Sequence, residues 1–106
     1  MEQITSHDHY SKVIREKGSV LMFSASWCPD CVVIDPVMPE LEEKHSELGF
    51  YKVNRDDFIE LCQELDIFGI PSFIVFKNGE EAGRFVSKDR KTKEEIDTFI
   101  QEAKQK

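Results

Sequence analysis

Residues 19–25, SVLMFSA, form a short apolar run that ends just before two closely spaced cysteines, Cys28 and Cys31. A nearly continuous apolar run of this length is typical of a strand buried on both faces of a sheet. Such a strand needs helices packed against both of its faces. Because the residues after the cysteines read as a helix, we expect the two thiols at the carboxyl end of a strand, where α/β sheets form their sites.

The remaining segments alternate between helical and strand periodicity. Pro36 lies inside the helical pattern that follows the cysteines, and a kink is expected there because proline removes a backbone donor. Asn78 and Gly79 separate two apolar runs and predict a hairpin turn. These patterns predict helices over residues 6–18, 32–48, 56–67 and 92–106, and strands over residues 49–54, 72–76 and 81–87.

Two of the predicted helices begin with a capping-box signal, Asp57 with Glu60 and Thr92 with Glu95. The strand, helix, strand order early in the chain implies a parallel pair with a right-handed crossover, and the hairpin adds antiparallel strands. The predicted fold class is therefore α/β, with a central mixed sheet and helices on both faces. A chain of 106 residues has the size of one domain, so a single domain over residues 1–106 is expected.

The charge balance narrows the range of partners. Fourteen basic residues against 21 acidic ones leave a net charge of -7. This argues against binding to nucleic acid or to an anionic membrane, because phosphate groups need clustered Lys and Arg. The chain shows no basic leader before an apolar stretch, and no run approaches the ~18 apolar residues of a membrane span. A cytoplasmic monomer is expected.

Cys28 and Cys31 have the spacing that disulfide exchange requires, in which one thiolate attacks a disulfide and a second thiol resolves the mixed disulfide. At a helix N-terminus Cys28 would stand at the exposed mouth of the turn, where unpaired amides and the helix dipole lower the pKa of a thiol. Cys31, one turn further in, would be the more buried, resolving thiol. Three cysteines are too few for a disulfide scaffold, and a close pair in a reducing cytosol is more often catalytic, redox-active or metal-bound.

Two other interpretations of the cysteine pair stay open at this point. In the first, the chain is a binding module and the dithiol is a redox switch for docking of a partner. In the second, the pair shares a metal ion between two chains, although no second Cys or His pair stands near it to complete a zinc site. His7, His9 and His45 are expected on polar helical surfaces, and Cys62 is expected as a small buried hydrophobe.

The chain resembles the thioredoxin family over nearly its whole length. The resemblance rests on Trp27, Cys28 and Cys31 after an apolar strand, on Pro36, Lys52 and Asn54, and on the segments GIPSF (residues 69–73) and FKNGE (residues 76–80). It implies the thioredoxin fold and a protein-disulfide reductase in which Cys28 attacks and Cys31 resolves. It also implies that a flavin-dependent thioredoxin reductase drawing on NADPH reduces the pair again, and that the chain itself binds no cofactor and no metal.

The resemblance further implies a substrate groove formed by Trp27, Pro29, Asp30, Ile70 and Pro71. Pro71 would follow a cis peptide bond and face the dithiol, although only about 5–6% of X–Pro bonds in folded proteins are cis. The backbone of Ile70 would pair with an extended substrate segment. Oxidase or isomerase activity is the alternative within the same chemistry, because reduction potentials in this fold span roughly 150 mV. A cytosolic setting favours reduction.

The chain departs from the family pattern in three features. Between the cysteines, Pro29 and Asp30 replace Gly-Pro and resemble the motif of thioredoxin-related proteins, and the charge of Asp30 raises thiol pKa values. Met22 stands where the family usually has a buried acid that helps to deprotonate the resolving thiol, so Lys52 lacks its usual partner. We expect Asp30, or a water that it orders, to replace part of this base. Ser87 stands about where the family has a glycine on the groove wall.

Overall fold

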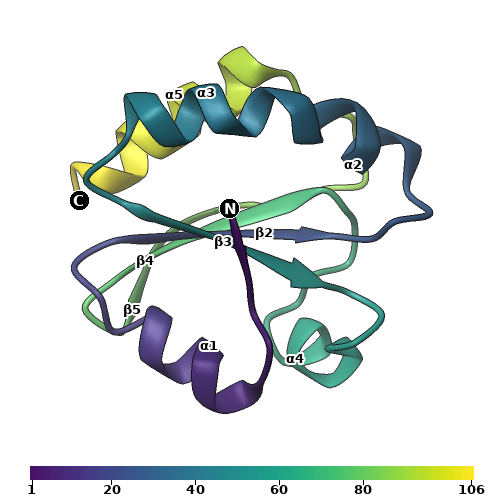
Figure 1. Ribbon diagram of the computed structural model, residues 1–106, viewed down its shortest axis with the longest axis horizontal. Helices are drawn as coiled ribbons and strands as arrows, with labels where there is room; N and C mark the ends of the chain where they lie inside the picture. The colour runs from purple at the N-terminus through teal and green to yellow at the C-terminus, as the bar shows by residue number, and fades with distance from the viewer.

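The computed structural model describes residues 1–106 and has a five-stranded mixed sheet at its centre (Figure 1). The strands are β1 (Glu2–Gln3), β2 (Ser19–Ser24), β3 (Gly49–Asn54), β4 (Ser72–Lys77) and β5 (Glu80–Phe85). They lie in the order β1–β3–β2–β4–β5 across the sheet. The pairs of β3 with β1 and with β2 are parallel, whereas β4 pairs antiparallel with β2 and with β5. The predicted α/β class with a mixed sheet is confirmed.

Helices cover both faces of the sheet, as the sequence predicts. On one face lie α1 (His7–Val13) and α4 (Ile59–Glu64) (Figure 1). On the other face lie α2 (Pro29–Ile34), α3 (Met38–Lys44) and α5 (Lys93–Lys104). A 3-10 turn, η1 (Asp35–Val37), separates α2 from α3 and contains Pro36, so the kink predicted at this proline is confirmed.

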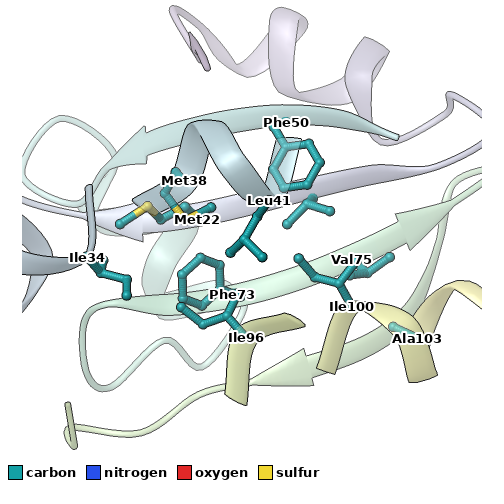
Figure 2. Close-up of a cluster of buried hydrophobic side chains, with 11 residues drawn as sticks. Met22, Ile34, Met38, Leu41, Phe50, Phe73, Val75, Ile96, Ile100 and Ala103 are labelled. Atoms are coloured by element: carbon teal, nitrogen blue, oxygen red, sulfur yellow. The ribbon is translucent and has the colours of Figure 1, made fainter. Parts of the chain in front are cut away.

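All six residues of β2 are buried, and their side chains alternate between two cores. Val20 and Met22 belong to the core beneath α2, α3 and α5, which Figure 2 shows. Leu21 and Phe23 belong to the core on the side of α1 and α4. Burial of each such side chain contributes about 1.5–3 kcal/mol to stability. Because β2 has no solvent face, its sequence has no alternation of apolar and polar residues.

Local signals at the end of the chain predicted the structure correctly. The Thr92 side chain accepts a hydrogen bond from the Glu95 amide, and the Glu95 carboxylate accepts one from the Thr92 amide, so this capping box is confirmed. The turn between β4 and β5 has positive φ at both Asn78 (54°) and Gly79 (89°). Positive φ at both central residues matches the twist of the flanking strands and is typical of an Asn-Gly hairpin.

Other local predictions were wrong. The short strand β1 was not predicted, because two residues carry no periodic signal and their conformation depends on pairing with β3. The capping box expected at Asp57 and Glu60 does not form, since α4 begins without a side-chain cap. The side chain of Asn54, at the end of β3, instead accepts a hydrogen bond from the Asp56 amide at 2.8 Å. This bond holds the chain in a turn before the helix begins.

The first helix is shorter than the sequence predicts and ends at Val13. The carbonyl oxygens of Ile14 and Glu16 accept hydrogen bonds from the turn between β4 and β5, at 2.8 Å from the Gly79 amide and 2.9 Å from the Asn78 amide. These carbonyls are therefore engaged by a distant segment rather than by the next turn of a helix.

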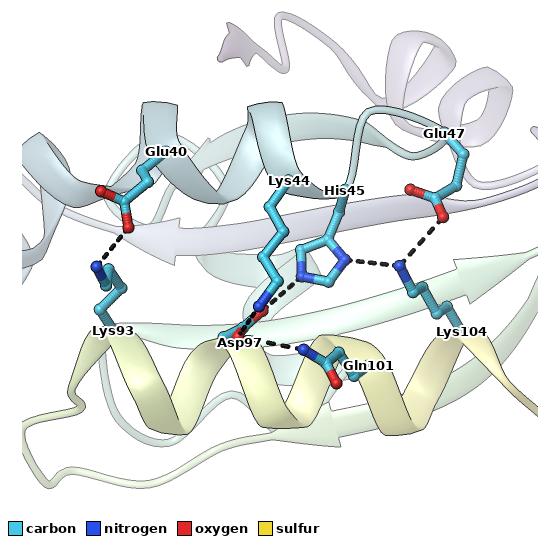
Figure 3. A network of polar contacts seen from close by, with 8 residues as sticks. All are labelled: Glu40, Lys44, His45, Glu47, Lys93, Asp97, Gln101 and Lys104. Carbon is cyan, nitrogen blue, oxygen red and sulfur yellow. Dashed lines mark hydrogen bonds and ion pairs between the residues drawn. The ribbon is translucent and has the colours of Figure 1, made fainter.

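His45 is buried, which corrects its expected place on a polar surface. Its Nε2 lies 2.7 Å from Oδ1 of Asp97 in α5, and its Nδ1 lies 2.8 Å from Nζ of Lys104 (Figure 3). An ammonium group only donates, so Nδ1 accepts and Nε2 carries the proton. Nζ of Lys44 lies 2.6 Å from the second oxygen of Asp97. This network joins the end of α3 to α5.

We expect Asp97→Ala to lower the free energy of unfolding by about 1–3 kcal/mol at neutral pH, because it leaves buried His45 without its acceptor. Hydrogen bonds from Lys44 and His45 hold the pKa of Asp97 down at about 2. A carboxylate with a depressed pKa stabilises the fold above its unfolded pKa of about 3.9, and this contribution is lost as pH falls through the folded value. The difference between wild type and variant should therefore shrink between about pH 4 and pH 2, measured by urea denaturation.

Glu40→Ala is the matched control, since Glu40 is an exposed carboxylate of α3 that pairs with Lys93 of α5. An exposed pair of this kind contributes only about 0–1 kcal/mol. A destabilisation by Asp97→Ala that stays constant down to the lowest pH would show that the charge of Asp97 does not stabilise the fold.

Candidate functional site

Cys28 and Cys31 lie in the first turn of α2, directly beyond the end of β2. Cys28 is the N-cap residue, and its Sγ accepts a hydrogen bond from the Cys31 amide at 3.2 Å. Pro29 occupies the first turn of the helix, where its missing N–H leaves no hydrogen bond unmade. The sulfur of Cys28 thus takes the place of the oxygen of a common N-cap side chain, a position that favours negative charge.

Both thiols are buried, which corrects the expected exposure of Cys28. The exposed fractions are 5% for Cys28 and 3% for Cys31, and both cysteines are free thiols. Sγ of Cys28 lies 3.8 Å from the carbonyl oxygen of Ile70. Ala25 and Ile70 pack against the pair. The sequence does not reveal this cover, because Ile70 belongs to a segment far along the chain.

The loop before β4 faces the dithiol. The peptide bond between Ile70 and Pro71 is cis, as the family resemblance implies. Phe23 near the end of β2 pairs with Ser72 at the start of β4. This antiparallel pair brings the loop next to the turn that carries Cys28, so two segments separated in sequence form one site.

Burial raises the pKa of Cys31 to about 12, and the hydrogen bond with Cys28 and the negative charge of Asp30 add to this effect. The Cys31 thiol is therefore protonated at neutral pH, and a step in which it attacks needs a proton acceptor.

The third cysteine, Cys62 in α4, is 3% exposed, which confirms it as a small buried hydrophobe. Burial raises the pKa of the Cys62 thiol as well.

The segment between β5 and α5 contacts Asp30 between the two cysteines and Gly69 in the facing loop. Of its residues the sequence analysis named Ser87 but not Arg90 or Lys91. Nε of Arg90 lies 2.8 Å from Oδ1 of Asp30. Lys91 is 3% exposed, and its Nζ donates to the Ser87 carbonyl at 3.2 Å and to the Ser87 hydroxyl at 3.0 Å. Burial lowers the pKa of Lys91. A Cβ at Gly69 would lie 2.5 Å from the Ser87 carbonyl oxygen, so this close approach requires glycine.

Trp27 presents an exposed aromatic surface beside Cys28. Its side chain is 58% exposed, and its Nε1 donates to Oδ2 of Asp56 at 2.8 Å. The guanidinium of Arg55 lies 5.9 Å from the centre of the indole. Phe68, two residues before Ile70 on the facing loop, is 65% exposed. The hydrogen bond orients the indole while much of the ring remains open to solvent.

A pocket of about 150 Å³ reaches Cys31 and also contacts Asp35 and Lys52. Nζ of Lys52 lies 2.8 Å from the Asp35 carboxylate, so the lysine that lacked its family partner has another acidic partner. Met22 is fully buried in the core. The rest of the pocket lining consists of Gln3, Ser24, Ala25, Ser26, Val32 and Asn54.

The structure contains no group of three or more His, Cys, Asp or Glu side chains placed to hold a metal ion, whereas structural zinc sites use four ligands.

None of its helices combines the length and apolar character needed to cross a bilayer.

The model of the thioredoxin family matches residues 1–102. Thioredoxin AMT13 of Alternaria alternata is 34% identical over 97 residues, which cover 90% of this chain and 82% of that protein. The thioredoxin of Callithrix jacchus is 32% identical over 105 residues, which cover 96% of this chain and 97% of that protein. The crystal structure of Malassezia sympodialis thioredoxin superposes with a TM-score of 0.81 at 30% identity, over 96% of this chain and 92% of that chain.

These similarities extend over nearly the whole chain and include the turn that carries the dithiol. The TM-score also agrees with the mixed sheet of this chain. The chain therefore belongs to the thioredoxin family, whose members are protein-disulfide oxidoreductases, and it is a thiol–disulfide oxidoreductase.

Proposed function

We propose that the chain reduces protein disulfides, with Cys28 as the attacking thiol and Cys31 as the resolving thiol. The Cys28 thiolate attacks one sulfur of a substrate disulfide, a bond forms between Cys28 and the substrate, and the second substrate sulfur leaves as a thiolate. Cys31 then loses its proton and attacks Sγ of Cys28, which forms the internal disulfide and releases the first substrate sulfur. Two electrons pass to the substrate, and its two sulfurs take up protons.

The hydrogen bond from the Cys31 amide to Sγ of Cys28, at 3.2 Å, carries this assignment. It gives Cys28 a donor that stabilises a thiolate. Cys31 has a pKa raised to about 12, chiefly by burial, so it is suited to act after the substrate is held on its neighbour. The two cysteines therefore differ in hydrogen bonding more than in exposure.

The proposed substrate groove consists of Trp27, Pro29, Asp30, Ile70 and Pro71. The Ile70 amide donates to no backbone acceptor of the chain, so it is free to pair with an extended substrate segment. Trp27 adds an aromatic surface that is 58% exposed. These two groups lie on the two segments that meet at Cys28, which supports a groove running across the dithiol.

The direction of electron flow depends on the reduction potential of the dithiol relative to the potential of its compartment. A reducing cytosol keeps such a pair in the dithiol form, which favours the reductive direction. We propose a cytoplasmic, monomeric single domain over residues 1–106, and a flavin-dependent thioredoxin reductase that uses NADPH as its electron donor.

With NADPH and a thioredoxin reductase, we expect the wild-type chain to reduce the disulfides of insulin, measured as oxidation of NADPH. Cys28→Ser should remove this activity, because the proposed attacking thiol is lost. Cys31→Ser should stop at the mixed disulfide, which mass spectrometry detects as a covalent adduct. Cys62→Ala is the control, since Cys62 lies outside the site in α4. Wild-type activity in Cys28→Ser would contradict the assignment.

Limited iodoacetamide at neutral pH should label Cys28 before Cys31 and Cys62. Burial raises the pKa of both of the latter thiols, so few of them are ionised. Peptide mass spectrometry counts the labels, and prior unfolding in urea should expose all three cysteines equally. Equal labelling of Cys28 and Cys31 in the folded chain would assign them similar reactivity and argue against the proposed order of attack.

Trp27→Ala should raise the KM for a protein disulfide about tenfold, because an exposed aromatic contact of this kind contributes roughly 1–2 kcal/mol to binding. Reaction with a small aromatic disulfide should change little, since such a substrate does not fill the groove. Ile59→Ala is the control for loss of exposed apolar surface, because Ile59 is 48% exposed and lies in α4. Equal effects of Trp27→Ala on both substrates would place the indole outside the groove.

A further inference from the structure

If Cys31 resolves the mixed disulfide as proposed, its proton needs an acceptor, so the inference rests on that proposed function. Met22, at the position where an acid would serve, is fully buried and packs in the core with Ile34 and Met38 (Figure 2). A thioether sulfur is too weak an acceptor to take a proton from a thiol. Lys52 pairs in register with Met22 across β2 and β3. Lys52 therefore lies beside the position of the missing acid, and the carboxylate that pairs with it must come from another part of the chain.

Asp35 lies on the same side of the helix as Cys31. It follows Cys31 by four residues, and its amide donates to the Cys31 carbonyl. Residues at this spacing are neighbours on a helix, with Cβ atoms about 5–6 Å apart. Nζ of Lys52 lies 2.8 Å from the Asp35 carboxylate and holds it against β3. The ion pair thus fixes an acid one turn from the resolving thiol.

The pocket of about 150 Å³ joins these groups, because Cys31, Asp35 and Lys52 all line it. Its walls also carry polar side chains of Ser24 and Asn54. At about 30 Å³ per molecule, a polar pocket of this size admits several waters. Cys31 is 3% exposed, whereas the Asp35 side chain is 45% exposed. A path therefore leads from a buried thiol through a polar pocket to a solvated carboxylate.

We propose that Asp35, held by Lys52, accepts the Cys31 proton through water in this pocket during release of the substrate. The S–H bond of Cys31 breaks, and its electron pair forms the bond to Sγ of Cys28. The bond between Cys28 and the substrate breaks, and the electron pair leaves on the substrate sulfur, which takes up a proton from solvent. Asp35 then loses its proton to solvent at the open side of the pocket.

Asp30 is the competing acceptor, and its surroundings differ. Its carboxylate pairs with Arg90 at 2.8 Å, and it is not among the residues that line the pocket. Its negative charge raises the pKa of Cys31, after the larger effect of burial. Removing the charge of Asp30 should therefore ease deprotonation of Cys31, whereas removing Asp35 should hinder it. The two substitutions are expected to change the release step in opposite directions.

Stopped-flow reaction with 5,5′-dithiobis(2-nitrobenzoate) separates the two steps, because attack by Cys28 and attack by Cys31 each release one coloured thiolate. Asp35→Asn should slow the second release about ten- to a hundredfold at neutral pH and leave the first nearly unchanged. The second rate should be nearly independent of pH near neutrality in the wild type. In Asp35→Asn it should rise about tenfold per pH unit, because it then follows the thiolate fraction of Cys31.

Asp35→Glu should restore most of the second rate, and Lys52→Met should slow it less than Asp35→Asn does. Asp57→Asn is the matched control, since Asp57 is an exposed carboxylate outside the pocket. Unchanged thermal unfolding of each variant excludes a general loss of structure. A wild-type rate and pH slope in Asp35→Asn would overturn the inference, as would a second release slowed by Asp30→Asn alone. A wild-type first release that persists in Cys28→Ser would instead overturn the proposed function.

Discussion

The antiparallel pairing of β2 with β4 holds the two halves of the site together. Phe23 pairs with Ser72, so the end of β2 and the start of β4 meet at one edge of the sheet. One strand leads into the turn of Cys28, and the other follows the cis peptide bond at Ile70. A slip of one residue would exchange the side chains of the two cores. The 3.8 Å approach of Cys28 Sγ to the Ile70 carbonyl therefore depends on core packing on both faces.

Structural features that depend only on residues close together in the chain could be predicted from the sequence. The fully buried strand β2, the kink at Pro36, the capping box at Thr92 and the turn at Asn78 are each determined within a few residues. The order of the predicted elements extended this to the α/β class, and the family resemblance extended it to the cis bond before Pro71, which local preference alone would not favour. Where a nearby competitor exists, local signals fail, as the Asn54 side chain shows at the start of α4.

Contacts between residues far apart in the chain could not be predicted from the sequence. His45 is buried because Asp97, 52 residues further along, supplies its acceptor. Lys52 has a partner in Asp35, 17 residues earlier, and no periodic pattern links them. Charged residues in a polar run are indistinguishable from solvated surface until the tertiary fold pairs them. The burial of Cys28 could not be predicted for the same reason, because Ile70, which packs against it, lies 42 residues away in the sequence.

Met22 keeps the central strand apolar at a point where a carboxyl would be costly, since an ionised group in a core costs several kcal/mol unless it is well paired. The acid and the lysine beside the pocket are instead partly solvated, with side chains 45% exposed for Asp35 and 21% for Lys52. Met22 thus serves core packing, and Asp35 and Lys52 serve proton transfer. Substitutions in one group can therefore occur in evolution without changing the other group. An ion pair open to solvent is also screened by salt. Salt screens a buried ion pair much less, so ionic strength should affect how strongly Lys52 holds the Asp35 carboxylate in place.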